Sequence, residues 1–116
     1  MAVLIVDDEA DIRETLEEFL SDEGFAVLSA ANGAQALHIL TDEQPCLVLL
    51  DLMMPVLSGN EVIEHMQNDE RLASVPIIIT TSDPSRAPPG IPIMKKPLSL
   101  VGLLDAVQRH CTRASG

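Results

Sequence analysis

The stretch Cys46–Gly59, CLVLLDLMMPVLSG, decides the fold class, because an almost wholly apolar run carries one carboxylate, Asp51, close to its end. A short apolar run that is followed by proline and glycine is typical of a buried β-strand that leads into a loop. An ionised carboxylate at the end of a buried strand is costly unless another group compensates its charge. The rest of the chain must therefore supply that compensation.

Short apolar runs alternate with helical patterns along the whole chain, which predicts an α/β fold with a parallel sheet buried on both faces. Helical spacing predicts a helix after each of the first three strands and a last helix after Pro97. The predicted strands are Ala2–Val6, Phe25–Ser29, Cys46–Leu50, Val75–Thr80 and Ile91–Met94.

The fourth connection departs from this regularity. Nine residues, Ser82 to Gly90, precede Ile91, fewer than the roughly dozen that a helical crossover between parallel strands needs. Three prolines in this interval would break any helix longer than about one turn. We therefore expect the helix here to be absent or very short, which would expose apolar strand surface.

Composition bounds the function. The 116 residues, 1–116, form one predicted domain, and 7 Lys plus Arg against 18 Asp plus Glu give a net charge of −11. This charge argues against direct binding to nucleic acid or an anionic membrane. No apolar run approaches the roughly 20 residues of a membrane span, and the N-terminus resembles no signal peptide, so we expect a cytoplasmic protein.

Cys46 and Cys111 have no metal-ligand spacing, so we expect small core residues of a reducing compartment, without redox or metal function.

Acidic residues follow two of the predicted strands. Asp7, Asp8 and Glu9 follow the first strand, and Asp51 follows the third. In parallel α/β sheets the functional groups gather at the carboxyl ends of the strands. If these two strands are neighbours, the carboxylates repel one another unless a cation neutralises them. Oxygen-only ligands favour a hard cation, and the sequence therefore predicts a Mg²⁺ site.

Hydroxyl and ammonium groups follow two further strands, the fourth and the fifth. Thr80, Thr81 and Ser82 close the fourth strand, and Lys95 and Lys96 follow the fifth. An ammonium group beside a metal-bound carboxylate would disperse the charge of a transferred phosphoryl group, with Asp51 as the nucleophile. Taken singly, each group has a simpler interpretation: a helix cap, a strand end or a solvated edge. Their joint arrival at one side of the sheet favours the chemical interpretation.

These residues resemble the receiver domain of two-component response regulators. VLIVDDEADIR is similar to its first strand and acidic pair, LVLLDLMMPVLSG to its phosphoacceptor strand, VPIIITTS to its fourth strand and MKKP to its lysine–proline element. The resemblance covers nearly the whole chain in the expected order. It implies a doubly wound five-stranded parallel sheet of flavodoxin-like order 2-1-3-4-5.

The resemblance also implies a role for each matching residue. Asp51 would be the phosphoacceptor, Asp8 a direct Mg²⁺ ligand, and Asp7 a ligand mainly through water. The backbone carbonyl of Met53 would complete the metal site, so that the metal residues are Asp7, Asp8, Asp51 and Met53. Thr81 would donate its hydroxyl to the phosphoryl group, Lys96 would pair with that group, and the Lys96–Pro97 bond would be cis. Lys95 would be a surface residue.

The function implied is a phosphorylation-controlled signalling switch rather than a metabolic enzyme. A sensor histidine kinase or phosphotransfer protein would donate the phosphoryl group in a Mg²⁺-dependent reaction, which the domain assists together with its own dephosphorylation. Ile93 stands where the family usually has an aromatic residue, and this departure, with the short fourth connection, leaves open a pseudo-receiver that signals without phosphorylation. An aspartate-dependent phosphatase would want a second acid where Met53 stands.

Overall fold

The sheet has five parallel strands in the order β2-β1-β3-β4-β5. The computed structural model describes residues 1–54 and 56–112. The strands are β1 (Val3–Val6), β2 (Val27–Ala30), β3 (Leu47–Asp51), β4 (Ile77–Thr81) and β5 (Ile93–Lys95). β1 pairs with β2 on one side and with β3 on the other, and β3 pairs in turn with β4. The predicted α/β fold and its strand order are confirmed.

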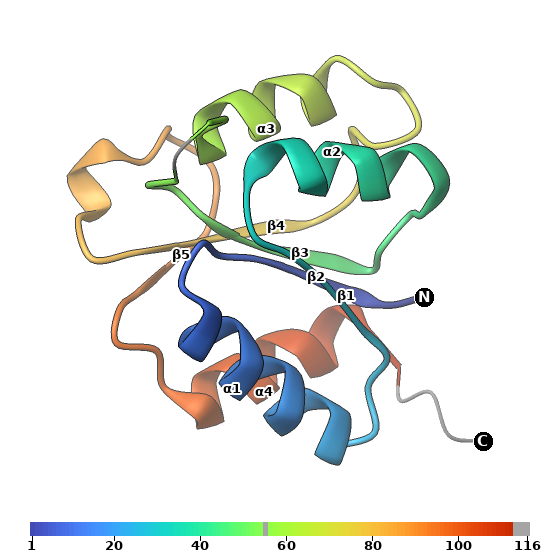
Figure 1. Cartoon of the computed structure of the whole chain (residues 1–116), viewed down its shortest axis with the longest axis vertical. Helices are drawn as coiled ribbons and strands as arrows, with labels where there is room; N and C mark the ends of the chain where they lie inside the picture. Colours follow the sequence, from blue (N-terminus) through green and yellow to red (C-terminus); the bar gives the residue numbers. More distant parts are fainter. Residues whose placement is uncertain (55, 113–116) are drawn as a thin grey trace.

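Helices cover both faces of this sheet (Figure 1). The helices α1 (Ala10–Asp22) and α4 (Leu100–His110) lie on one face, and α2 (Gly33–Asp42) and α3 (Gly59–Gln67) lie on the other. Local capping fixes where three of them begin, because Asn32, Ser58 and Ser99 each accept a backbone N–H of the first turn. Among the residues that the structure describes, no helix is long and apolar enough to span a bilayer.

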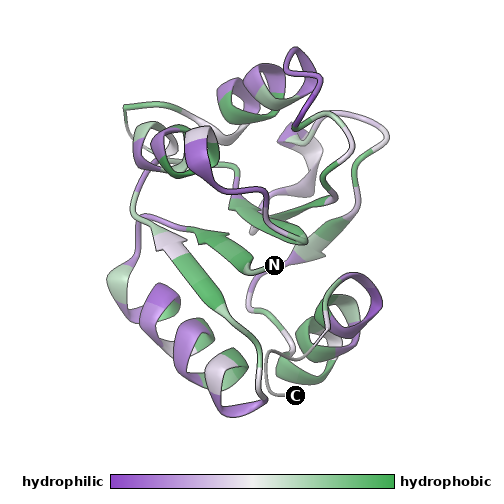
Figure 2. Ribbon diagram, turned by 90° about the vertical axis from the view of Figure 1, so that its right-hand side faces the viewer, coloured by the Kyte–Doolittle hydropathy of each residue, from purple (hydrophilic) through white to green (hydrophobic). Residues whose placement is uncertain are grey.

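Two aliphatic clusters fill the space between the sheet and the helix layers. Figure 2 shows the apolar strands between helices whose polar sides face outward. The cluster under α2 and α3 contains Leu50 and Ile79, and the cluster under α1 and α4 contains Leu49 and Ile78. Because side chains alternate along a strand, neighbours in sequence enter opposite clusters. This two-sided burial explains why the strands are continuous apolar runs.

The predicted strands differ from the observed ones by one or two residues at their ends. Cys46 precedes β3, and Asp51 is its last residue rather than the residue after it. Thr81 likewise lies within β4. Such shifts are expected because hydrogen-bond pairing with a neighbouring strand, which a sequence pattern does not report, decides where a strand ends.

The connection between β4 and β5 contains a single 3₁₀ turn, Pro84–Arg86, where the regular alternation would place a helix. The expected absence of a longer helix is therefore confirmed. Ala87 and Ile91 of this connection pack against the core cluster under α3, and Ile79 of β4 is buried. Among the described apolar residues of β4 and β5, Ile93 is the most exposed, at 39%.

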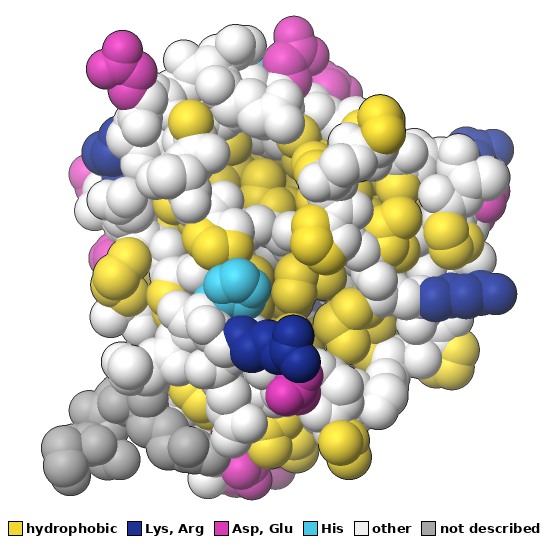
Figure 3. All heavy atoms as spheres, turned by 180° about the vertical axis from the view of Figure 1, so that it is seen from behind, with side chains coloured by type: hydrophobic (Ala, Val, Ile, Leu, Met, Phe, Trp, Pro, Cys, Tyr) yellow, Lys and Arg dark blue, Asp and Glu magenta, His cyan; other side chains and the backbone are white. Residues whose placement is uncertain are grey.

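Hydrophobic side chains are nevertheless visible at the surface. Figure 3 shows several of them over the middle of the face opposite to the view in Figure 1, with most acidic side chains near its edge. The most exposed large hydrophobic residues described are Met1, Met53, Val56, Ile93, Leu100 and Val101. Leu100 and Val101 begin α4, close in sequence to the end of β5.

The two cysteines form a disulfide bond, which corrects the expectation that they are unlinked core residues. Both are buried, as predicted, but Cys46 is bonded to Cys111 across a sequence separation of 65 residues, with 5.4 Å between their Cα atoms. The sequence offered no spacing signal for this bond, because it depends on the fold bringing the end of α4 beside the start of β3.

Candidate functional site

The three predicted carboxylates meet at the carboxyl ends of β1 and β3. β1 and β3 are paired in parallel with Val6 opposite Leu50, so the residues that follow these two positions, Asp7 and Asp51, lie side by side. Carboxylate oxygens of Asp7, Asp8 and Asp51 all lie within 4.8 Å of one another. Asp7 and Asp51 are buried, whereas Asp8 is exposed. The strand register therefore assembles the acidic cluster that the sequence predicted.

The loop after β3 holds Asp51 at close range. The backbone N–H of Met53 donates to Oδ1 of Asp51 at 3.2 Å. The N–H of Gly59, the first residue of α3, donates to the carbonyl oxygen of Leu52 at 3.1 Å. A Cβ atom at Gly59 would lie 2.7 Å from the carbonyl oxygen of Asp51, so only glycine fits here without a shift of the backbone. Glycine thus lets α3 begin directly against the acidic strand.

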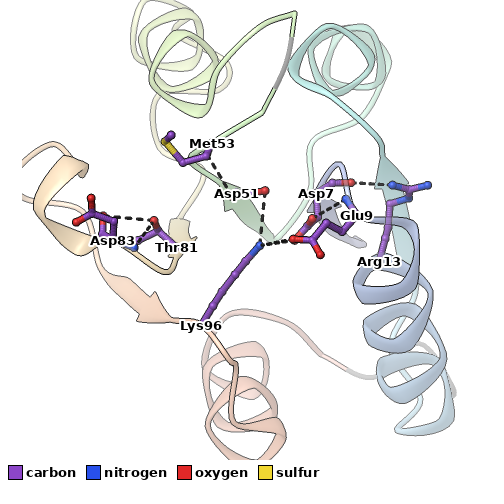
Figure 4. Close-up of polar contacts among 8 residues, drawn as sticks. All are labelled: Asp7, Glu9, Arg13, Asp51, Met53, Thr81, Asp83 and Lys96. Carbon is purple, nitrogen blue, oxygen red and sulfur yellow. Dashed lines mark hydrogen bonds and ion pairs between the residues drawn. The ribbon is translucent and has the colours of Figure 1, made fainter.

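Lys96 supplies the compensating positive charge (Figure 4). Its Nζ atom lies 3.0 Å from Oδ2 of Asp7, 3.6 Å from Oδ2 of Asp51 and 4.0 Å from Oε1 of Glu9. The Lys96 side chain is only 15% exposed. The Lys96–Pro97 bond is cis, as the resemblance implied. Lys95 is exposed and makes no ion pair among the described residues, which matches its expected surface position.

Asp7 is fixed by three contacts from different parts of the chain. Its Oδ1 atom accepts the backbone N–H of Glu9 at 2.9 Å, and its Oδ2 atom accepts the ammonium group of Lys96. Its backbone carbonyl accepts Nη1 of Arg13, on the first turns of α1, at 2.7 Å. Both the carboxylate and the main chain of Asp7 are therefore held in place, which favours a preformed site.

Burial and neighbouring charges shift the pKa values of Asp51 and Lys96 at the centre of the site. The pKa of Asp51 is raised from 3.8 to about 6. Burial is the largest cause and the nearby Asp7 adds to it, while Lys96 and the Met53 N–H lower the pKa and offset part of the rise. For Lys96, burial alone would lower the pKa, but the hydrogen bond to Asp7 and the charge of Asp51 outweigh it and raise the pKa. Lys96 is therefore charged at neutral pH.

Thr81 lies on the neighbouring strand with its hydroxyl turned to the β4–β5 connection. The hydroxyl accepts the backbone N–H of Asp83 at 3.1 Å and donates to the Asp83 carbonyl at 3.4 Å. Asp83 in turn accepts Ser85 N–H and hydroxyl groups at the start of the 3₁₀ turn, and the Ser85 hydroxyl is the main cause that lowers the pKa of Asp83. The Thr81 side chain is thus part of a hydrogen-bond chain into that turn (Figure 4).

Three contributors were not predicted from the sequence as parts of the site. Arg13 holds the backbone of Asp7, and Asp83 holds the hydroxyl of Thr81. Arg86 pairs with Asp83 at 3.4 Å and places Nη1 3.9 Å from the sulfur of Met53, whose side chain is half exposed. The contacts with Thr81 and between Arg86 and Asp83 are local, two and three residues apart in sequence. The Arg13 contact depends on the phase of α1, and the Arg86–Met53 contact depends on the course of the irregular connection.

The donor set defines what this site can hold. The cluster offers carboxylate oxygens from Asp7, Asp8 and Asp51, and no nitrogen or sulfur ligand joins it among the described residues. Such a set fits a hard divalent cation such as Mg²⁺, which commonly takes carboxylates together with waters and phosphate oxygens. The adjoining ammonium group of Lys96 suits an anionic group placed beside Asp51.

Comparison with known proteins agrees with this geometry. Residues 3–88 match the family described as the response regulator receiver domain. The sporulation initiation phosphotransferase F of Bacillus subtilis is 35% identical over 93% of this chain and 91% of its own length. A probable transcriptional regulator ycf27 of Porphyridium aerugineum is 48% identical over 69% of this chain and 32% of its own length. The chain thus spans about a third of the length of several regulators that it matches.

Solved structures show the same architecture. The chemotaxis response regulator CheY4 of Vibrio cholerae superposes with a TM-score of 0.85 at 29% identity, over 96% of this chain and 99% of that one. The receiver domain of the sensor histidine kinase PA1611 of Pseudomonas aeruginosa, with a magnesium ion coordinated in its active-site cleft, gives a TM-score of 0.86 at 25% identity. That alignment covers 94% of this chain and 95% of the other.

Proposed function

The chain belongs to the response regulator receiver domain family, and on this premise we propose that it is a signalling switch controlled by phosphorylation of Asp51. The observation that carries the proposal is the position of Asp51, buried at the end of β3, 3.6 Å from the ammonium group of Lys96 and within 4.8 Å of two further carboxylates. A carboxylate in such surroundings is a suitable nucleophile for phosphoryl transfer.

In the proposed reaction, one carboxylate oxygen of Asp51 attacks the phosphorus atom of a phosphohistidine on a sensor histidine kinase or phosphotransfer protein. A P–O bond forms as the P–N bond breaks, and the histidine leaves with its electron pair. Lys96 then faces the transferred anionic group, and Asp7 keeps Lys96 oriented through their hydrogen bond at 3.0 Å. The Thr81 hydroxyl, which now bonds to Asp83, is the donor on β4 that we assign to the transferred group.

Mg²⁺ would be held by Asp7, Asp8 and Asp51 with the Met53 carbonyl, and when bound it supplies charge neutralisation for the carboxylates and the transferred group. The oxygen-only cluster of Asp7, Asp8 and Asp51 supports this choice of cation. With these groups the domain would promote the phosphorylation and dephosphorylation of its own Asp51, and it would not act as an enzyme on a separate metabolite. We place the protein in the cytoplasm, where kinase and Mg²⁺ would be available, without direct contact to nucleic acid or membrane.

Intact-protein mass spectrometry tests this proposal. Incubation with acetyl phosphate and Mg²⁺ should add one phosphoryl group to the wild type and none to Asp51→Asn. Asp22→Asn, which makes the same charge change at an exposed residue at the end of α1, serves as the control and should be phosphorylated normally. A wild-type mass that stays unchanged under these conditions would overturn the proposal.

A pseudo-receiver is the second candidate, and two observations favour it. Ile93 replaces the usual aromatic residue of the family, and the Thr81 hydroxyl is already engaged by Asp83. Such a protein would keep the site but signal through constant contacts with its partner. Partner binding that is equal for wild type, phosphorylated wild type and Asp51→Asn would favour this second candidate over the switch.

A further inference from the structure

The disulfide between Cys46 and Cys111 lies at the end of the sheet away from the acidic site. Cys46 immediately precedes β3, and Asp51 is the last residue of the same strand. Five residues of β-strand span about 17 Å, so the disulfide touches none of the phosphorylation chemistry directly. In Figure 1 the N-terminus and the end of α4 lie on one side of the molecule, and the β4–β5 connection lies on the other. The cysteine pair is therefore a separate feature that the proposed function does not explain.

We propose that Cys46 and Cys111 are a reversible thiol–disulfide pair, and that the oxidised form locks the last turn of α4 to the sheet. The inference goes beyond phosphorylation, but it uses the cytoplasmic location proposed above. Disulfides are rare in the reducing cytoplasm, and those that occur there are usually transient or redox-sensing. A pair of cysteines placed to bond in such a protein is accordingly better explained as a redox-responsive site than as a permanent crosslink.

The two cysteines are held differently by their surroundings. Cys46 is anchored, because its backbone N–H donates to the carbonyl of Ala2 at 2.9 Å as the β1–β3 pairing begins. Cys111 is the residue that caps the end of α4, and its N–H donates to the carbonyl of Val107 at 2.8 Å. Helix ends open more easily than paired strands. On reduction, Cys111 is therefore the partner that moves.

The reduced form also has a suitable environment. The sulfur of Cys46 lies 3.8 Å from the carbonyl oxygen of Met1, so a thiol at this position has an acceptor for its weak S–H donor. Both residues remain slightly accessible, at 8% and 7% exposure. This small accessibility permits attack by a small thiol or disulfide after slight opening of the helix end. Reduction therefore leaves no buried polar group without a partner at Cys46.

The disulfide changes how α4 is held. Leu103 and Val107 are fully buried in the cluster against the sheet, whereas residues 108–110 of the same helix are exposed. In the reduced form, the last turn depends on helix hydrogen bonds and on the packing of Cys111 alone. Oxidation adds a covalent link to the anchored Cys46, and opening of this turn then requires the sheet to move as well. The redox state should therefore alter the dynamics of the end of α4 while the fold is kept.

The exchange reaction balances with glutathione as the redox partner. One oxidised glutathione accepts two electrons and two protons from the two thiols in successive exchange steps, giving one intramolecular disulfide and two reduced glutathione molecules. The reverse reaction, with two reduced glutathione molecules, restores both thiols. No metal or other cofactor takes part.

The first test is a redox titration of the whole chain. The protein is equilibrated in glutathione buffers from fully reduced to fully oxidised, quenched with acid and alkylated. Its intact mass is then measured by mass spectrometry. We expect two alkyl groups at the reducing end, none at the oxidising end and a continuous change between them. A disulfide that persists in excess reduced glutathione would show a permanent crosslink, and two thiols that persist in oxidised glutathione would show no pair. A stable mixed disulfide with glutathione would also overturn the proposal.

The second test measures amide exchange in α4. We expect the amides of residues 108–111 to exchange about tenfold more slowly in the oxidised than in the reduced wild type. Cys111→Ser keeps Cys46 but cannot form the bond, so its exchange should not respond to glutathione. Equal exchange in both forms of the wild type would overturn the locking of α4. Asp51→Asn should give the same redox titration as the wild type, so failure of the phosphorylation proposal is distinguishable from failure of this one.

Discussion

The hydroxyl of Thr81 accepts the backbone N–H of Asp83 at 3.1 Å, and this hydrogen bond joins the end of β4 to the 3₁₀ turn at Pro84–Arg86. The hydroxyl can keep this acceptor role while its proton is redirected, because its present donor bond, to the Asp83 carbonyl, is long at 3.4 Å. A phosphoryl oxygen on Asp51 would be a stronger acceptor. We therefore expect phosphorylation of Asp51 to act on the turn through Thr81, without an aromatic residue at Ile93.

We predict that beryllofluoride, a phosphoryl mimic, with Mg²⁺ slows amide exchange across residues 82–94. A hydroxyl that donates to a charged acceptor becomes a better acceptor itself, so the bond from the Asp83 N–H should strengthen. Hydrogen-exchange mass spectrometry measures the effect. Thr81→Val lacks the hydroxyl and should show no slowing, whereas Thr81→Ser should retain it. Unchanged exchange in a wild type that demonstrably binds beryllofluoride would rule out this route.

The raised pKa of Asp51 predicts a pH-dependent stability of the metal-free protein. In the folded state this pKa is about 6, against an ordinary value of 3.8. Between these two values the folded protein retains a proton that the unfolded chain has released, so its stability falls as pH rises through this window. The loss of stability caused by ionising Asp51 is absent below pH 3.8 and complete above about pH 6, where it amounts to about 3 kcal/mol.

Asp51→Asn removes this cost. In the presence of a chelator, the variant should be more stable than the wild type above about pH 7, by up to about 3 kcal/mol, and the difference should shrink towards about pH 4. It should also gain less stability from added Mg²⁺, because one ligand is lost. Urea unfolding at several pH values measures this, with Asp22→Asn as control. A variant less stable than wild type at neutral pH without metal would argue against carboxylate crowding.

Because Lys96 lies beside the same carboxylates that would hold a cation, its removal gives a further prediction with a matched control. Lys96→Gln should lower the melting temperature of the metal-free protein at neutral pH, because Asp7 and Asp51 lose their buried partner. Mg²⁺ should then bind more tightly and raise the melting temperature more than in the wild type. Lys95→Gln makes the same charge change at an exposed position. If Mg²⁺ raises the melting temperatures of both variants equally, the contacts of Lys96 with Asp7 and Asp51 do not control cation binding.

Much of the fold was predictable because it rests on periodicity and on short-range signals. Continuous apolar runs such as Leu47–Leu50 predicted strands buried on both faces, and the prolines after Thr81 predicted the missing helix. The acidic cluster followed from the rule that strand ends share one edge of the sheet. The adjacent positions of Asp7 and Asp51 could therefore be predicted from the sequence.

Contacts that depend on tertiary packing were not predictable in this way. The disulfide joins two cysteines 65 residues apart, and neither has a local signal for the other. The bond from Arg13 to the Asp7 carbonyl depends on the phase of α1. The contact of Arg86 with the sulfur of Met53, 33 residues away, depends on the path of an irregular segment. In each case the sequence specifies the residue type, and the fold alone specifies its partner.

The close approach of α3 to the acidic strand gives the last prediction. A methyl group at Gly59 would lie 2.7 Å from the carbonyl oxygen of Asp51 and 2.9 Å from the Cα atom of Leu52. Both are main-chain atoms of the strand end and cannot rotate away. Gly59→Ala should therefore lower the free energy of unfolding by about 1–3 kcal/mol and slow phosphorylation by acetyl phosphate, because Asp51 must shift.

Gly102→Ala is the matched control, since Gly102 lies within α4 and a methyl group there would meet only side-chain atoms at 3.6 Å, an ordinary contact distance. This variant should gain about 0.5–1 kcal/mol of stability, because alanine is the better helix former, and should be phosphorylated at the wild-type rate. Urea unfolding and the initial rate of phosphate incorporation measure both variants. A Gly59→Ala protein with wild-type stability and rate would show that the start of α3 does not constrain Asp51.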